Sequence, residues 1–168
     1  MSLAVAFSLG SNLGDRQAYL HAAARKLVVE LGGASLSSLW ETEPVEVEDR
    51  QAAYLNLCVA GETQLSPRSL LELCARLESE AGRKSAHREA RVLDVDLLLL
   101  ADQIVKEPDL LLPHPGLARR RFVLAPLGEV LPDWVHPLTG KNVLEMLEAL
   151  GETQAARLHK PLKDWWND

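Results

Sequence analysis

The chain has 168 residues, of which 47% are hydrophobic and 25% are charged, and this composition is typical of one soluble globular domain. Its formal net charge of −6 argues against general nucleic-acid binding, because that function requires a basic surface. The two cysteines, Cys58 and Cys74, lie in apolar runs without metal-ligand spacing, so we expect buried thiols in a reducing cytoplasm.

Apolar periodicity and turn residues predict an alternation of strands and helices. We expect four strands where apolar and β-branched residues are concentrated, over residues 3–9, 35–42, 54–61 and 94–100. Two helices lie between them, one over residues 15–31 and one that begins at Ser66-Pro67 and ends at Gly82. The resulting βαββαβ order predicts a ferredoxin-like α+β sandwich, in which two helices pack on one face of an antiparallel sheet.

The second part of the chain carries weaker signals. Residues 104–105 could add a short strand, residues 113–127 are predicted to form a loop with a short helix, and residues 143–150 have helical spacing. We therefore assign residues 1–150 to a single domain. Residues 151–168 form a C-terminal tail that is either weakly ordered or docked through its tryptophans.

Two carboxylates, Asp94 and Asp96, interrupt the last of the four strands. Strand side chains alternate between faces, so these two point to the same face, with Cα atoms roughly 6.5–7 Å apart. Like charges on a largely buried strand are costly, and a divalent cation would remove that cost. Oxygen ligands favour Mg²⁺, which usually shares its coordination shell with waters and phosphates. The pattern is short, however, and a strand end with aspartates facing water satisfies it too.

Basic residues cluster on both sides of this acidic strand. Seven of the 18 lysines and arginines lie in the two flanking stretches, and they are Arg83, Lys84, Arg88, Arg91, Arg119, Arg120 and Arg121. Each cluster alone could be a solvated loop or a helix end. Together with metal-binding carboxylates they favour phosphoryl transfer, in which metals bridge the phosphates and cations stabilise developing charge.

With these residues placed, the chain resembles the 6-hydroxymethyl-7,8-dihydropterin pyrophosphokinase family of folate biosynthesis over residues 3–135. The resemblance implies an enzyme that transfers diphosphate from ATP to the pterin hydroxymethyl group and releases AMP. Its pieces, in order, are Gly10-Ser11-Asn12, Thr42-x-Pro44, Tyr54-Leu55-Asn56, Glu78 with Gly82-Arg83, Arg91-Val92-Leu93-Asp94-Val95-Asp96, Pro113-His114-Pro115 and Arg120-x-Phe122-Val123-Leu124-x-Pro126-Leu127.

The resemblance also implies roles for the charged residues. Asp94 and Asp96 would hold two Mg²⁺ ions on the ATP phosphates. The residues that contact ATP would be Glu78, Arg83, Arg91, His114 and Arg120. The three arginines would be catalytic together with Asp96, because attack on the β-phosphorus spreads negative charge over oxygens and fixed cations lower that barrier.

A pterin pocket is implied as well, formed by Thr42, Pro44, Val45, Tyr54, Asn56 and Phe122. The Asn56 amide both donates and accepts, so it suits the amide edge of a pterin. Tyr54 and Phe122 offer apolar or stacking surface, although plain core packing would also explain them.

The loop between Gly82 and Asp94 departs from the family pattern. It is shorter, Glu89-Ala90 replaces the usual glycine-proline, and it lacks the tryptophan that commonly covers the pterin. We expect Arg88, or else His87, to cover that face, because a planar guanidinium also stacks on rings.

Two other interpretations remain open from the residues. A ferredoxin-like module that binds a regulatory ligand without catalysis would explain the fold but not the charged residues. A D-x-D metal enzyme acting on nucleotide sugars would explain Asp94 and Asp96 but not the Tyr54–Asn56 pocket. We expect a cytoplasmic monomer that binds ATP and the pterin, with no nucleic-acid or membrane partner, since no run approaches transmembrane length and Met1–Leu9 lacks a cationic leader.

Overall fold

A six-stranded antiparallel sheet forms the centre of the fold in the computed structural model, which describes residues 1–43, 52–82 and 92–167. Its strand order is β5-β1-β4-β3-β8, and β2 also pairs with β4. Its strands are β1 (Leu3–Ser11), β2 (Gly32–Leu36), β3 (Leu39–Thr42), β4 (Tyr54–Thr63), β5 (Asp94–Leu100) and β8 (Ala156–Lys160).

Helices cover both faces of this sheet. They are α1 (Arg16–Glu30), α2 (Pro67–Glu80), α3 (Arg121–Val130), α4 (Val143–Leu150) and the short α5 (Leu162–Trp165), with a 3₁₀ turn over Leu117–Arg119. A separate two-stranded hairpin consists of β6 (Val105–Glu107) and β7 (Leu110–Leu112). The predicted α+β class with a ferredoxin-like core is confirmed.

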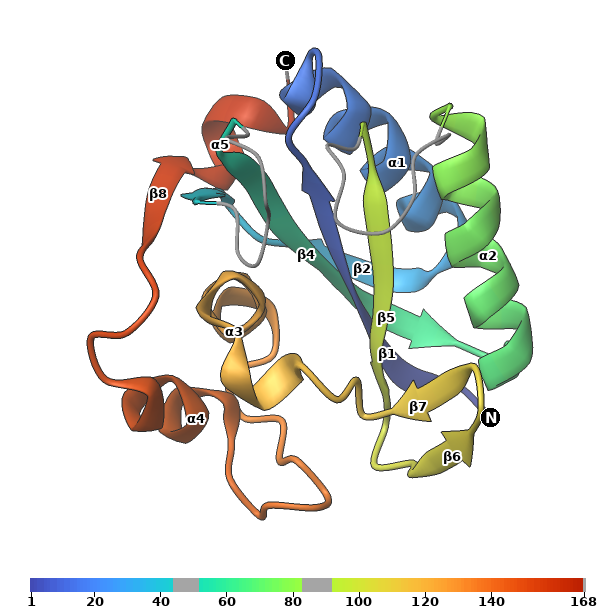
Figure 1. The fold of residues 1–168 in the computed structure, drawn as a ribbon. Coiled ribbons are helices and arrows are strands. Elements are labelled where there is room, and N and C mark those ends of the chain that lie inside the picture. Colours follow the sequence, from blue (N-terminus) through green and yellow to red (C-terminus); the bar gives the residue numbers. More distant parts are fainter. Residues whose placement is uncertain (44–51, 83–91, 168) are drawn as a thin grey trace.

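The helices α1 and α2 pack against one face of the sheet, as the sequence predicts (Figure 1). Their N-termini are capped by Asp15 and Ser66, whose side chains accept hydrogen bonds from Ala18 N and Ser69 N. The buried core between these helices and the sheet includes Phe7 on β1 and Leu57 on β4, both fully buried. This burial holds β1 and β4 at the middle of the sheet.

A second layer, which the sequence did not predict, lies on the opposite face. There α3 and α4 pack on small residues, Ala6 and Cys58 among them. A register shift in the pairing of β1 with β5 leaves Leu98 without a paired residue, so Leu98 and Leu99 both enter this second core. These helices cover only part of the face, because the Asp94 end of β5 lies outside the second core.

The single strand expected over residues 35–42 is two strands, and this prediction is wrong. The strand is interrupted at Ser37 and Ser38, where side chains take part in the hydrogen bonding. Ser37 N still donates to the backbone of β4, at Cys58 O. The Ser37 hydroxyl accepts from Cys58 N at 2.9 Å, and the Glu129 carboxylate on α3 accepts from Ser38 N at 3.2 Å. Trp40 on β3 donates its indole N–H to the same carboxylate at 2.6 Å.

The C-terminal segment adds an edge strand and a buried anchor. The strand β8 pairs with β3, and α5 places Trp165 in the main core with no exposed surface. The indole of Trp165 donates to Ser37 O at 3.3 Å, across 128 positions of sequence. Residues 156–165 thus contact both the sheet edge and the main core.

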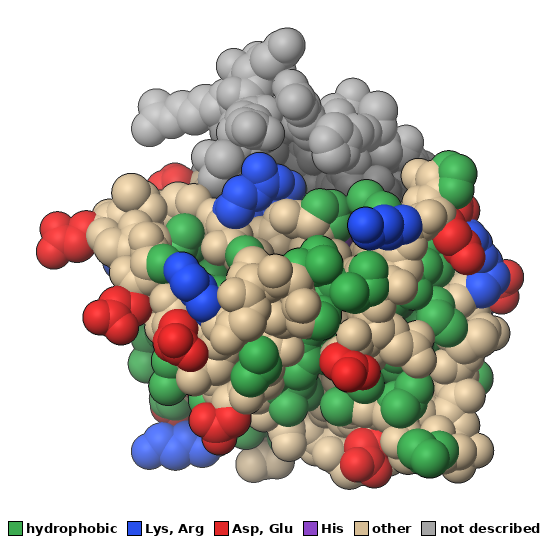
Figure 2. Space-filling view, turned by 90° about the horizontal axis from the view of Figure 1, so that it is seen from below, with side chains coloured by type: hydrophobic (Ala, Val, Ile, Leu, Met, Phe, Trp, Pro, Cys, Tyr) green, Lys and Arg blue, Asp and Glu red, His purple; other side chains and the backbone are tan. Residues whose placement is uncertain are grey.

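The surface mixes apolar and charged side chains. On the face shown in Figure 2, acidic and basic side chains are dispersed among apolar ones. Large apolar residues with substantial exposure, such as Val135 and Leu144, are ordinary on a globular surface when they occur singly. Among the helices described, none combines the length and apolar character needed to span a bilayer.

The loop between α3 and α4 contains His136, whose side chain is a pH-dependent element of the fold. The residue is 6% exposed, and its Nδ1 accepts from Leu138 N at 3.1 Å. Burial lowers the pKa of His136, so the unfolded chain binds a proton at a pH where the folded chain does not.

We therefore expect the free energy of unfolding to fall as the pH drops below the unfolded value of about 6.5. His136→Gln removes this titration and should flatten the fall in Tm between about pH 7.5 and pH 5. Melting curves of both proteins across this range test it. The same pH profile in both proteins would rule out a contribution from His136.

Candidate active site

The candidate site begins with one row of residues across three adjacent strands. Gly10 on β1 is paired with Asp94 on β5 and with Asn56 on β4. Directly paired residues point to the same face of a sheet, and neighbouring strands lie about 4.8 Å apart. Asp94 and Asn56 thus project from the same face on either side of a glycine, at the end that α3 and α4 leave uncovered.

Asp94 and Asp96 are both partly buried and lie on this face, paired with Gly10 and Ser8 respectively. Two carboxylates at this spacing fit a hard divalent cation that takes its other ligands from water and phosphate. In the described ranges, no group of three or more His, Cys, Asp and Glu side chains is arranged to hold a metal.

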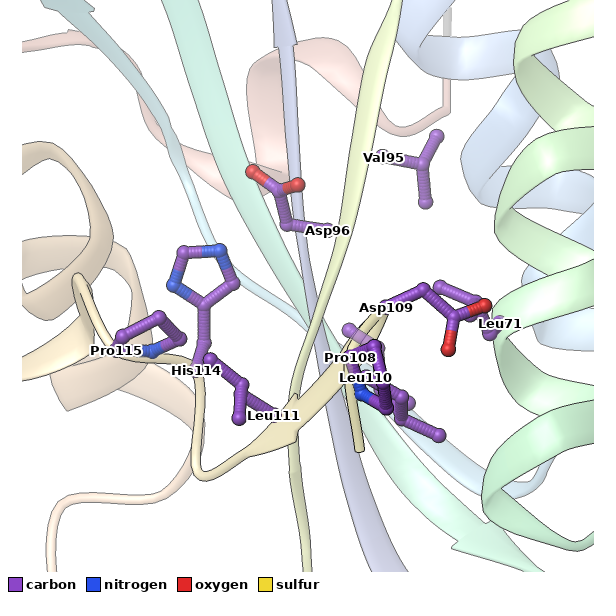
Figure 3. A pocket seen from close by; sticks show the side chains of 10 residues that line it. Leu71, Val95, Asp96, Pro108, Asp109, Leu110, Leu111, His114 and Pro115 are labelled. Carbon is purple, nitrogen blue, oxygen red and sulfur yellow. The ribbon is translucent and has the colours of Figure 1, made fainter. Parts of the chain in front are cut away.

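His114 faces Asp96 from the loop that follows β7 (Figure 3). Its backbone N–H donates to Leu98 O at 2.8 Å, which attaches this loop to the outer edge of β5. Its Nδ1 accepts from Gly116 N at 3.0 Å, so the ring hydrogen of the neutral imidazole is on Nε2. Burial lowers the pKa of His114, while Asp96 opposes this shift and Arg120 reinforces it. Near neutral pH this side chain is an uncharged hydrogen-bond donor.

Arg120 lies at the start of α3, and its guanidinium is 5.8 Å from the centre of the Phe122 ring. This cation–π contact directs the exposed arginine across the partly buried aromatic ring. Gly116 makes room for it, since a Cβ at that position would lie 2.6 Å from Arg120 Nε. Gly116 thus supports both His114 and Arg120, a role that sequence reasoning missed although the glycine directly follows His114-Pro115.

Asn56 is a buried amide with a fixed orientation. Its Nδ2 donates to the Thr42 hydroxyl on β3 at 2.7 Å. Its Oδ1 lies against Gly10, where an added Cβ would be 2.9 Å away, and the Tyr54 ring would be 3.4 Å from that Cβ. The structure therefore brings together three of the expected pterin residues, Thr42, Tyr54 and Asn56, around the glycine that opens the Gly10-Ser11-Asn12 motif.

A pocket of about 300 Å³ lies beside Asp96, along the outer edge of β5 (Figure 3). Within the residues that the structure describes, β5 pairs with β1 alone. The pocket is lined by Asp96 and His114 on one side and by Asp109 on the other (Figure 3). Apolar residues of α2, β5 and the β6–β7 hairpin, including Leu71, Leu97 and Leu111, complete the lining. The pocket can take a flat, largely apolar group next to the carboxylates.

Other expected site residues lie apart from this row or outside the described ranges. Glu78 is on α2, which packs on the other face of the sheet from Asp94 and Asn56. Burial raises the pKa of the Cys74 thiol on the same helix, and the charges of Asp96 and Glu78 add to this shift. Arg83, Arg91, Pro44 and Val45 lie outside the described residues, as do the expected pterin covers His87 and Arg88. Their roles stay predictions.

Comparison with known proteins identifies the family. The profile described as 7,8-dihydro-6-hydroxymethylpterin-pyrophosphokinase (HPPK) matches residues 6–132. A 2-amino-4-hydroxy-6-hydroxymethyldihydropteridine pyrophosphokinase of Bacillus subtilis is 42% identical over 126 residues, which cover 73% of this chain and 75% of that protein. The protein of the same description from Aquifex aeolicus is 35% identical over 142 residues, covering 84% and 88%.

Longer proteins match too. The folic acid synthesis protein fol1 of Schizosaccharomyces pombe is 37% identical over 155 residues, and these cover 90% of this chain but 21% of that protein. A crystal structure of HPPK-DHPS in complex with substrates has the same fold, with a TM-score of 0.70 at 13% identity. It is matched over 91% of this chain and 44% of its own length. By its profile match and its bacterial relatives, the chain belongs to the 7,8-dihydro-6-hydroxymethylpterin pyrophosphokinase family.

Proposed function

We propose that the chain transfers diphosphate from ATP to the hydroxymethyl group of 6-hydroxymethyl-7,8-dihydropterin and releases AMP, as a step of folate synthesis. The observation that supports this proposal is the row from Asp94 through Gly10 to Asn56. It places carboxylates suited to a metal–phosphate complex about two strand spacings from an amide suited to a pterin. The intervening glycine makes room for the Asn56 amide, because an added Cβ would lie 2.9 Å from Asn56 Oδ1.

On the nucleotide side, Asp94 and Asp96 would hold two Mg²⁺ ions, which would neutralise phosphate charge. His114 Nε2 would donate to a phosphate oxygen, since its Nδ1 is already engaged by Gly116. Arg120 would add a fixed cation, and we assign Arg83 and Arg91 the same role. The apolar pocket beside Asp96 would take the adenine, with the backbone of β5 as a hydrogen-bonding edge.

On the acceptor side, the Asn56 amide would bond the pterin edge and hold its hydroxymethyl oxygen toward the β-phosphorus. Thr42 fixes the amide orientation by its hydroxyl, and Phe122 would stack on the ring beside Arg120. Fixed placement of two reactants is the largest contribution these residues can make, because phosphoryl transfer needs alignment and charge stabilisation more than covalent help. We further propose a cytoplasmic monomer, to which the two free, buried cysteines are suited.

Asp94→Asn and Asp96→Asn test the metal assignment. Each removes one anionic ligand, and turnover should fall by at least ~10²-fold, the scale for losing one preorganised electrostatic element. The fold should survive, because losing one of two like charges relieves repulsion. AMP release from ATP, Mg²⁺ and the pterin is the measurement. Near-normal turnover in both variants would refute the assignment, and wild-type protein that forms no AMP would refute the proposed function.

Gly10→Ala tests the meeting point of the two substrates. The new Cβ would press on Asn56 Oδ1, and Thr42 restrains the amide from moving aside. Affinity for the pterin should fall about tenfold or more, because a misplaced hydrogen-bonding edge is left unpaired. ATP affinity, measured by calorimetry on the same protein, should change little. Equal losses for both ligands would point to a general distortion of β1 and against this arrangement.

Phe122→Ala tests the stacking face. Loss of a stacked aromatic contact should weaken pterin binding by roughly 1–3 kcal/mol. ATP affinity should hardly change, and Tm should stay close to the wild-type value because the ring is only partly buried. If ATP binding, pterin binding and Tm fall together, the residue is part of the core and the pocket is wrongly placed.

A further inference from the structure

A cluster of opposite charges ties the β6–β7 hairpin to α2. Arg68, in the first turn of α2, donates from Nη1 to the Asp109 carboxylate at 2.7 Å and from Nη2 to the Glu107 carboxylate. Glu107 ends β6 and Asp109 immediately precedes β7. One guanidinium therefore contacts both sides of the hairpin turn, and its planar geometry suits two carboxylates at once.

The same hairpin forms a wall of the pocket beside Asp96. Residues 108–111 line that pocket, together with Leu71, which lies three positions after Arg68 and so on the same side of α2. Figure 3 shows the Asp109 carboxylate next to Leu71, while His114 and Asp96 lie on the other side of the pocket. Arg68 thus binds a charged residue of the pocket wall.

The charge of Asp109 matters for any anionic occupant. Its hydrogen bond to Arg68 lowers the pKa of Asp109, so the carboxylate is ionised at neutral pH. A nucleoside triphosphate carries several negative charges, and an uncompensated carboxylate within about 10 Å of it would weaken binding. The guanidinium of Arg68 offsets this charge and leaves the pocket closer to neutral at its hairpin end.

We infer that Arg68 is a positioning residue for the nucleotide, which holds the β6–β7 hairpin as one pocket wall and offsets the charge of Asp109 beside the ligand. This inference rests on the proposed function, because it takes ATP as the occupant of the pocket. The cluster lies at the end of the pocket away from Asp96, so its loss should affect ATP binding and leave the chemical step nearly unchanged.

Arg68→Ala is the first test, with Arg76→Ala as its control. Arg76 is also on α2 and pairs with exposed carboxylates, Glu30 and Glu80, that do not line the pocket. We expect Arg68→Ala to raise the KM for ATP and the Kd for ATP without pterin by about 2- to 5-fold, a scale set by exposed ion pairs. The kcat, the KM for pterin and Tm should stay near wild type, and Arg76→Ala should change none of these values.

A second variant separates charge from general disruption. Adding Asp109→Asn to Arg68→Ala removes the uncompensated carboxylate that lines the pocket and leaves Glu107, which does not line it, so part of the lost ATP affinity should return. The loss of ATP affinity caused by Arg68→Ala should also be smaller at about 0.5 M salt, because salt screens exposed charges. An unchanged Kd for ATP in Arg68→Ala, an equal effect of Arg76→Ala, or no recovery in the double variant would overturn the inference. Wild-type protein that binds no ATP would overturn the proposed function itself.

Discussion

The register of β1 with its two neighbours is the constraint on which the rest of the site depends. Because β1 pairs with β4 on one side and β5 on the other, the position of Gly10 decides which residues of those strands meet. A shift by one residue would turn Asp94 and Asn56 to the opposite face and bury them against the core of α1 and α2. Fully buried residues such as Phe7 and Leu57 hold this register, because the same slip would expose them. The strand register that packs the core is therefore the same register that places Asp94, Gly10 and Asn56 in one row.

The uncovered end of the sheet follows from how the two helical layers differ in extent. On one face α1 and α2 bury long apolar side chains along most of the strands. On the other, α3 and α4 pack over small residues of β1 and β4 and over two leucines of β5. The small side chains let α3 approach the sheet, and its first turn brings Phe122 and Arg120 toward the open end. The candidate site is thus bounded by a sheet on one side and by the start of a helix on the other. Glu129, further along α3, anchors the helix to β3 through Ser38 and Trp40.

Local patterns in the sequence predicted those parts of the fold that local forces determine. The helices α1, α2 and α4 have clear apolar spacing, and for α4 the predicted and observed ranges, residues 143–150, are identical. The alternation in β5 was enough to place Asp94 and Asp96 on one face. The break between β2 and β3 and the pairing of β8 could not be predicted, because both depend on partners far away in the chain, such as Glu129 and Trp165. For the same reason, no local pattern shows that Gly10 lies between Asp94 and Asn56.

The bond between Trp165 and Ser37 has a consequence for the order in which the protein assembles. A ribosome delivers Trp165 only after another 128 positions have followed Ser37. Before Trp165 is synthesised, the main core lacks the indole that fills it in the folded protein. The edge of β3 that pairs with β8 is then also unpaired by β8. Contacts of such long sequence separation form slowly, because a long loop must close before they contribute. The nascent chain should therefore pass through a state with a nearly complete sheet and one exposed edge, which is the state most open to chaperones.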